Sequence, residues 1–210
     1  MKLKRVLNVV GLFALHFFVS CNDSSPKFFL PVLGEKFVKN NDTVYHVIKS
    51  FKLLNQFGET VTNQTVEGKI YVANFFFATC QSICPIMSTN LGTVQKVFEK
   101  DDSLLILSHS VNPLHDTVQV LRNYGMTYGA MKTKWHLLTG DKKQIYELAK
   151  ASYLVNALED DGTPEGFLHS ELLLLIDSKG RMRGAYDGTD EAQVKKLIED
   201  IKLLKTERHP

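Results

Sequence analysis

Four apolar runs alternate with stretches that have the spacing of amphipathic helices, and this alternation restricts the fold more than any other feature. The runs cover residues 69–78, 103–112, 134–140 and 170–177, and they are rich in leucine, β-branched and aromatic side chains. Continuous apolar runs of this length are typical of strands buried on both faces of a sheet. Because helical stretches separate them, the first strands are expected to be parallel and covered by helices.

The remaining elements follow from local signals. Asp116 and Asp141 are expected to cap helices, and Pro85 is expected to start the helix after the first apolar run. A β-hairpin is expected around the turn at 55–58, another after the last apolar run, and a closing helix at 190–204. This order predicts the α/β class: a thioredoxin-like sandwich whose central mixed β-sheet is flanked by helices. The sheet is expected to be parallel in its first half and antiparallel at one edge, with an N-terminal β-hairpin extension.

The first residues have the pattern of an export signal. Basic side chains precede an apolar run at 6–19, and a small residue stands directly before Cys21. This pattern predicts a lipoprotein-type signal peptide over residues 1–20, with lipid attached to Cys21. An uncleaved anchor and cleavage at another position are the alternatives. Residues 21–44 are then a tether and an irregular segment, and residues 45–207 form the folded domain.

Length and charge limit the function. A chain of 210 residues has room for about one domain of this kind. The chain has 25 basic and 23 acidic residues, and Lys2, Lys4 and Arg5 lie in the expected signal, so 22 basic residues remain outside it. This balance argues against a nucleic-acid partner, because binding to nucleic acid needs a concentrated basic patch.

Two cysteines four residues apart, Cys80 and Cys84, lie between the first apolar run and Pro85. In an α/β sheet, chemistry gathers beyond the carboxyl end of a central strand, where the next helix begins. Unpaired amides and the helix dipole favour a thiolate there, so both sulfurs are expected to be reactive. A spacing of four also suits one helical face, close enough for a disulfide or for one shared soft metal ion.

The cysteine motif and a distant histidine resemble a known family. The sequences YVANFFFATCQSICPIM and FLHSELLLLIDSKGRMRGAYDG are similar to the Sco (SenC) family of copper-binding, thioredoxin-like proteins. This resemblance covers residues 47–204. It implies one copper ion per chain, Cu(I) or Cu(II), held by Cys80, Cys84 and His169. It also implies a role in assembling the copper centre of cytochrome c oxidase. The partner is then the copper-bearing oxidase subunit or another copper protein.

Two positions depart from the family pattern. In the stretch that matches S-x-D-P-x-x-D, Asn112 replaces the first acidic residue. Leu168 stands directly before the histidine, where relatives often have an acidic residue. Both changes affect outer hydrogen bonds that orient metal ligands, and neither changes a ligand itself.

The ligand chemistry also favours copper over zinc. Two thiolates and one imidazole suit copper, whereas zinc usually takes four ligands and the sequence offers no obvious fourth. Met87 is expected in the core rather than at the metal. The other histidines are expected at the surface or in local hydrogen bonds: His46, His109, His115, His136 and His209.

Two functions remain open. The first is a metallochaperone, which is not an enzyme in the strict sense, exported and anchored by its lipid to a membrane facing the periplasm. The second is a thiol:disulfide oxidoreductase with Cys80 and Cys84 as its redox pair. Exchangers of this fold usually carry C-x-x-C and a proline before the facing strand. Here three residues separate the cysteines, and Ser170 precedes that strand. An inert structural lipoprotein would explain neither the cysteines nor the histidine.

Overall fold

The computed structural model describes residues 29–155 and 170–207 of the chain. Its strands are β1 (Lys36–Lys39), β2 (Asp42–Tyr45), β3 (Lys52–Asn55), β4 (Thr60–Thr62), β5 (Ile70–Phe76), β6 (Leu104–Ser110), β7 (Trp135–Thr139), β8 (Leu172–Ile176) and β9 (Met182–Asp187). Its helices are α1 (Asn63–Val66), α2 (Ile83–Val97), α3 (Val118–Thr127), α4 (Lys142–Ala151) and α5 (Glu191–Thr206).

Seven strands form one mixed sheet in the order β4-β3-β7-β6-β5-β8-β9. The central strands β5, β6 and β7 are parallel, and antiparallel pairs flank them on both sides. The α/β class and the mixed sheet are therefore confirmed. The expectation of antiparallel pairing at only one edge was wrong, because the predicted hairpin β3–β4 joins the sheet beside β7.

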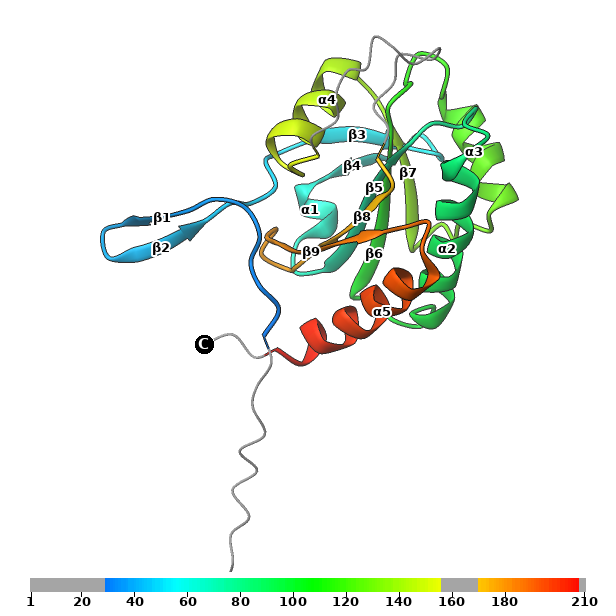
Figure 1. The fold of residues 1–210 in the computed structure, drawn as a ribbon. Helices are drawn as coiled ribbons and strands as arrows, with labels where there is room; N and C mark the ends of the chain where they lie inside the picture. The colour runs from blue at the N-terminus through cyan, green and yellow to red at the C-terminus, as the bar shows by residue number, and fades with distance from the viewer. Residues whose placement is uncertain (1–28, 156–169, 208–210) are drawn as a thin grey trace, which may run out of the picture.

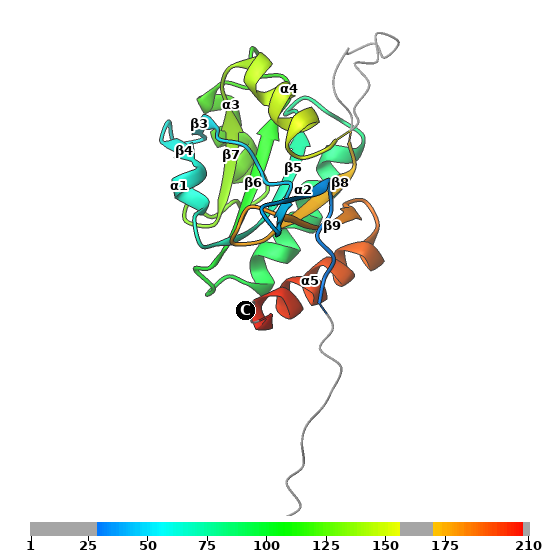
Figure 2. The same cartoon turned by 90° about the vertical axis from the view of Figure 1, so that its left-hand side faces the viewer.

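Helices cover both faces of this sheet (Figures 1 and 2): α2, α3 and α5 lie on one face, and α1 and α4 on the other. Strands β5 and β6 are buried at every position because they lie between the two helical layers. Across the first layer, Ser88 of α2 and Tyr124 of α3 share a hydrogen bond of 2.7 Å. The core thus extends through the centre of the sheet toward the strand ends that carry the cysteines.

A separate hairpin, β1–β2, projects from the body of the domain (Figure 1). Its turn residues Asn40 and Asn41 have positive φ angles of 52° and 67°, a conformation that asparagine tolerates better than most residues. Phe37 and Val38 are exposed on it. The predicted N-terminal hairpin extension is confirmed, but these strands lie within the segment that the sequence indicated to be irregular. Within residues 29–155 and 170–207, the structure contains no helix with the length and hydrophobicity of a membrane span.

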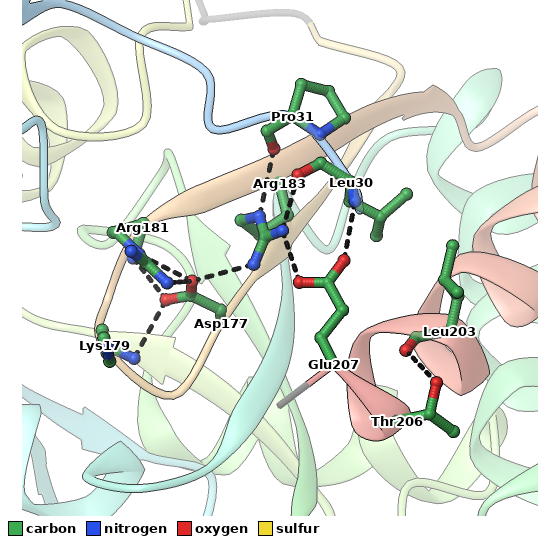
Figure 3. A network of polar contacts seen from close by, with 9 residues as sticks. All are labelled: Leu30, Pro31, Asp177, Lys179, Arg181, Arg183, Leu203, Thr206 and Glu207. Atoms are coloured by element: carbon green, nitrogen blue, oxygen red, sulfur yellow. Dashed lines mark hydrogen bonds and ion pairs between the residues drawn. The ribbon is translucent and has the colours of Figure 1, made fainter. Parts of the chain in front are cut away.

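A buried ionic cluster fastens the N-terminal segment to the domain (Figure 3). Arg183 on β9 pairs with Glu207 at 2.6 Å and with Asp177 at 3.2 Å. The same guanidinium donates to the backbone carbonyls of Leu30 and Pro31, at 2.6 and 3.0 Å. Glu207 in turn accepts from the Leu30 amide at 2.6 Å. Because Asp177 follows the end of β8, which is antiparallel to β5, this cluster lies at the sheet end opposite the cysteines.

Candidate metal and thiol site

Cys80 and Cys84 lie where β5 passes into α2. Cys80 occupies the turn after the strand, and its amide donates to the Phe77 carbonyl at 3.2 Å. Helix α2 begins at Ile83, two residues before the expected Pro85, so Cys84 is already inside its first turn. One cysteine therefore lies in a turn and the other in a helix, whereas the spacing of four had suggested two positions on one helical face. Both thiols are free and nearly buried, with 6% and 3% of their surface exposed.

The two sulfurs have different protonation tendencies. Burial raises the pKa of Cys80, but hydrogen bonds from Cys84 and Ser82 outweigh this effect, and the net pKa lies below the ordinary value. Burial raises the pKa of Cys84 to about 12, and the adjacent Cys80 adds to the increase. These pKa shifts favour the thiolate at Cys80 and the protonated thiol at Cys84, where burial outweighs the favourable position at the start of the helix.

This asymmetry predicts that Cys80 reacts first with an alkylating agent. In the reduced, metal-free protein at pH 8, we expect iodoacetamide to modify Cys80 at least about tenfold faster than Cys84, because the thiolate is the nucleophile. Peptide mass spectrometry after short exposures measures both rates. Cys84→Ser and Cys80→Ser proteins serve as controls, because each keeps only one of the two thiols of the site. Equal rates, or faster modification of Cys84, would contradict the prediction.

The loop between β6 and α3 lies against the cysteine turn. The carboxylate of Asp116 is fully buried and accepts from the Ala78 amide at 3.0 Å. The sequence suggested that Asp116 caps the following helix, but Asp116 does not cap α3. The cap is Thr117, whose side chain accepts from the Val120 amide, and the helix begins at Val118. The Asp116 side chain points instead toward the turn that leads to Cys80, and its charge contributes to the raised pKa of Cys84.

The structure tests only part of the predicted ligand set. Cys80 and Cys84 come together as expected, whereas His169, Leu168 and the lipidation candidate Cys21 lie outside the described residues. In the described ranges, no three His, Cys, Asp or Glu side chains are grouped so that they could hold a metal ion. Two adjacent thiols are soft donors that suit a monovalent copper ion, and they leave room for a further ligand.

The structure also places other residues that the sequence analysis discussed. Met87 is fully buried, which confirms its place in the core. The carbonyl of Asn112 accepts from the amides of His115 and Asp116, so this position shapes the loop through its backbone. His115 is half exposed and hydrogen-bonds to Asp116 through Nδ1 at 3.1 Å. His109 and His136 are buried rather than at the surface, and each has a hydrogen-bond partner, the Asn74 carbonyl for His109 and the Asn55 side chain for His136.

The fold and the paired thiols define a thioredoxin-like protein with its chemistry at the start of the helix after the first central strand. The sequence model of the SCO1/SenC family matches residues 39–205. The chain belongs to the SCO1/SenC family. A SCO1 protein homolog of Bacillus subtilis is 26% identical over 180 residues, which are 85% of this chain and 92% of the relative.

Solved structures agree with this assignment. A SCO1/SenC family lipoprotein from Bacillus anthracis is 28% identical, with a TM-score of 0.69 over 76% of this chain and 95% of that protein. BsSco, described as having a disulfide switch and as a member of the Sco family of cytochrome c oxidase assembly proteins, is 26% identical, with a TM-score of 0.67 over 78% and 95% of the two chains. Copper-bound ScoI of Bradyrhizobium japonicum is 25% identical, with a TM-score of 0.61 over 75% and 99%.

Proposed function

We propose that this protein is a copper-binding metallochaperone that assists assembly of the copper centre of cytochrome c oxidase. The observation that carries the proposal is the pair of adjacent, nearly buried thiols at the junction of β5 and α2 in a SCO1/SenC protein. Copper bound to ScoI and the assembly role described for BsSco support it. The copper ion is cargo, held by Cys80, Cys84 and His169 and passed to the copper-bearing oxidase subunit by ligand exchange.

The position of β8 supports His169 as the third ligand. Strand β8 is antiparallel to β5, with Ala73 opposite Leu174 and Tyr71 opposite Ile176. The start of β8 therefore lies at the same end of the sheet as the end of β5, which the cysteines follow. Ser170, the first described residue before β8, is buried, and its hydroxyl accepts from the Leu172 amide at 3.3 Å. His169 precedes Ser170 directly in the sequence, so a short path joins the imidazole to this end of the sheet.

Copper titration of the reduced protein tests the proposal. We expect one copper ion per chain, with a thiolate charge-transfer band for Cu(II). His169→Ala should weaken Cu(II) binding by about 100-fold or more, because it removes a ligand, and even groups that only surround metal ligands contribute about 10- to 100-fold. Cys84→Ser should lose the native charge-transfer band, so its spectrum serves as the reference for a site that lacks one thiolate ligand. A His169→Ala protein that binds as wild type would remove His169 from the ligand set, and a wild type without copper binding would overturn the function.

A thiol:disulfide oxidoreductase is the second candidate, favoured by the contact and unequal protonation of the two thiols. In that reaction the Cys80 thiolate attacks a target disulfide and releases one target thiolate. The Cys84 thiolate then attacks the mixed disulfide, which leaves a target dithiol and a Cys80–Cys84 disulfide. The disulfide switch described for BsSco is consistent with such a pair. Under this alternative, His169→Ala keeps activity in cells while Cys80→Ser loses it.

The location of the protein is part of the proposal. Export by residues 1–20 and lipid attachment at Cys21 would tether the domain to a membrane, with the domain facing the periplasm. The lipoprotein description of the Bacillus anthracis relative supports this arrangement. Mass spectrometry of the mature N-terminus, with Cys21→Ser as the comparison, tests it.

A further inference from the structure

The buried carboxylate of Asp116 lies at the centre of a polar cluster beside the cysteine turn. Its Oδ2 atom accepts from the Ala78 amide at 3.0 Å and from the Ser110 hydroxyl at 2.5 Å. Its Oδ1 atom lies 3.1 Å from Nδ1 of His115. Ala78 stands two residues before Cys80, on the segment that connects β5 with the site. The carboxylate thus joins its own loop, which contributes Ser110 and His115, to the segment before Cys80, which contributes Ala78.

This carboxylate has an unusual environment for a buried charge. The Asp116 carboxylate lies next to the exposed imidazole of His115. In residues 29–155 and 170–207, no lysine or arginine forms an ion pair with Asp116. A buried carboxylate is costly unless hydrogen bonds or opposite charges compensate for lost water. The amide and hydroxyl donors supply part of this compensation. A cation bound at the adjacent sulfurs would supply more, because Coulomb attraction is strong where solvent is excluded.

We propose that Asp116 is a positioning residue of the copper site: its carboxylate fixes the turn before Cys80 through the Ala78 amide, and its charge stabilises a cation bound by the cysteine pair. The inference rests on the proposed function, since it concerns the same site. The two contributions act at different atoms. The hydrogen bond from Ala78 orders the turn with or without metal, whereas the negative charge acts on the ion itself.

Two substitutions separate these contributions. Asp116→Asn keeps the side-chain shape and a carbonyl oxygen that can accept from Ala78 and Ser110, but it removes the charge. Asp116→Ala removes both the charge and the acceptor. Two measurements are needed: copper affinity by competition with a chromophoric Cu(I) chelator, and hydrogen exchange of the Ala78 amide in the copper-free protein. The second measurement does not depend on metal binding.

The expected results differ between the variants. Asp116→Asn should weaken copper binding by about tenfold or more, within the range known for groups that surround metal ligands, while Ala78 exchange stays close to the wild-type rate. Asp116→Ala should weaken copper binding further and speed Ala78 exchange by about tenfold, because the amide loses a charge-assisted hydrogen bond. Asp200→Asn is the matched control. That carboxylate is also buried, but it pairs with Tyr186 and Lys196 away from the cysteine turn.

Each contribution of Asp116 has a result that would contradict it. Wild-type copper affinity in Asp116→Asn overturns the role of the charge, and unchanged Ala78 exchange in Asp116→Ala overturns the role of the hydrogen bond. An equal loss of affinity in Asp200→Asn shows a general effect of altered buried carboxylates and also overturns the inference. If the wild type binds no copper, the proposed function fails, whereas Ala78 exchange still tests the positioning role.

Discussion

Replacing Glu207 by alanine is expected to lower the free energy of unfolding by about 3 kcal/mol, because it removes the closer of the two carboxylates that pair with the buried Arg183 guanidinium and leaves Asp177, at 3.2 Å, as the remaining one. Arg183 and Glu207 each have only 1% of their side-chain surface exposed, and their charged atoms lie 2.6 Å apart. Glu207 also accepts from the Leu30 amide, so the substitution removes one of the hydrogen bonds that hold the N-terminal segment. Urea denaturation of the reduced, copper-free protein measures the loss.

An exposed ion pair provides the control for this prediction. Lys143 and Glu147 lie one turn apart on α4, are separated by 4.0 Å and are largely exposed. Glu147→Ala should therefore change the free energy of unfolding by no more than about 0.5 kcal/mol. The double variant Arg183→Met/Glu207→Leu should recover part of the loss, because it leaves no buried charge unpaired. A loss below about 1 kcal/mol in Glu207→Ala would show that the cluster contributes little to stability.

The sheet was predictable from the sequence because its central strands are buried on both faces. A strand such as β5 needs mostly apolar side chains on both faces, and six of its seven residues are apolar or aromatic, a composition that is visible in the sequence alone. The hairpin β1–β2 gives no such signal, because its strands are exposed and mix charged with apolar residues. The turn at Asn40 and Asn41 was the available clue, since asparagine favours the positive φ that a tight hairpin needs.

The site was only partly predictable, because several of its properties depend on contacts between segments that are distant in the sequence. The motif identified Cys80 and Cys84, but the protonation of Cys84 depends on burial by distant segments, which spacing does not reveal. The contact of Asp116 with the cysteine turn was missed because an aspartate before a helix also fits a cap. Its actual donors include Ala78, which is 38 residues away in the chain. Contacts of this kind depend on how β5 and β6 are aligned, which only the folded structure defines.

His109 is fully buried rather than at the surface, and its environment leads to the second large expected effect. Its ring stacks on Phe75 with centroids 5.0 Å apart and packs against Tyr153 at 5.3 Å. Nδ1 donates to the Asn74 carbonyl at 3.3 Å, whereas Nε2 is buried without a hydrogen-bond partner in the described part of the chain. Burial in this aromatic surrounding lowers the pKa of His109 to about 4, so the folded protein keeps the ring neutral.

The depressed pKa predicts a loss of stability in mild acid. The unfolded chain takes up a proton at His109 near pH 6.5, whereas the folded protein does so only near pH 4. The stabilisation is therefore complete above about pH 6.5 and is lost as the pH falls toward 4, for a total of about 3 kcal/mol. Urea unfolding between pH 7.5 and 4 measures this loss. Burial also lowers the pKa of His136, which contributes with the same sign.

His109→Leu isolates the contribution of this residue. Leucine removes the titrating group and the unpaired nitrogen while keeping an apolar side chain among the aromatic rings, so most of the pH dependence should disappear. The part that His136 contributes should remain. NMR titration of the His109 ring in the wild type provides an independent readout, because its signals should not shift above about pH 5 if the ring stays neutral there. An unchanged slope in His109→Leu, together with a ring that titrates near pH 6.5, would show that the buried histidine accepts its proton without unfolding the protein.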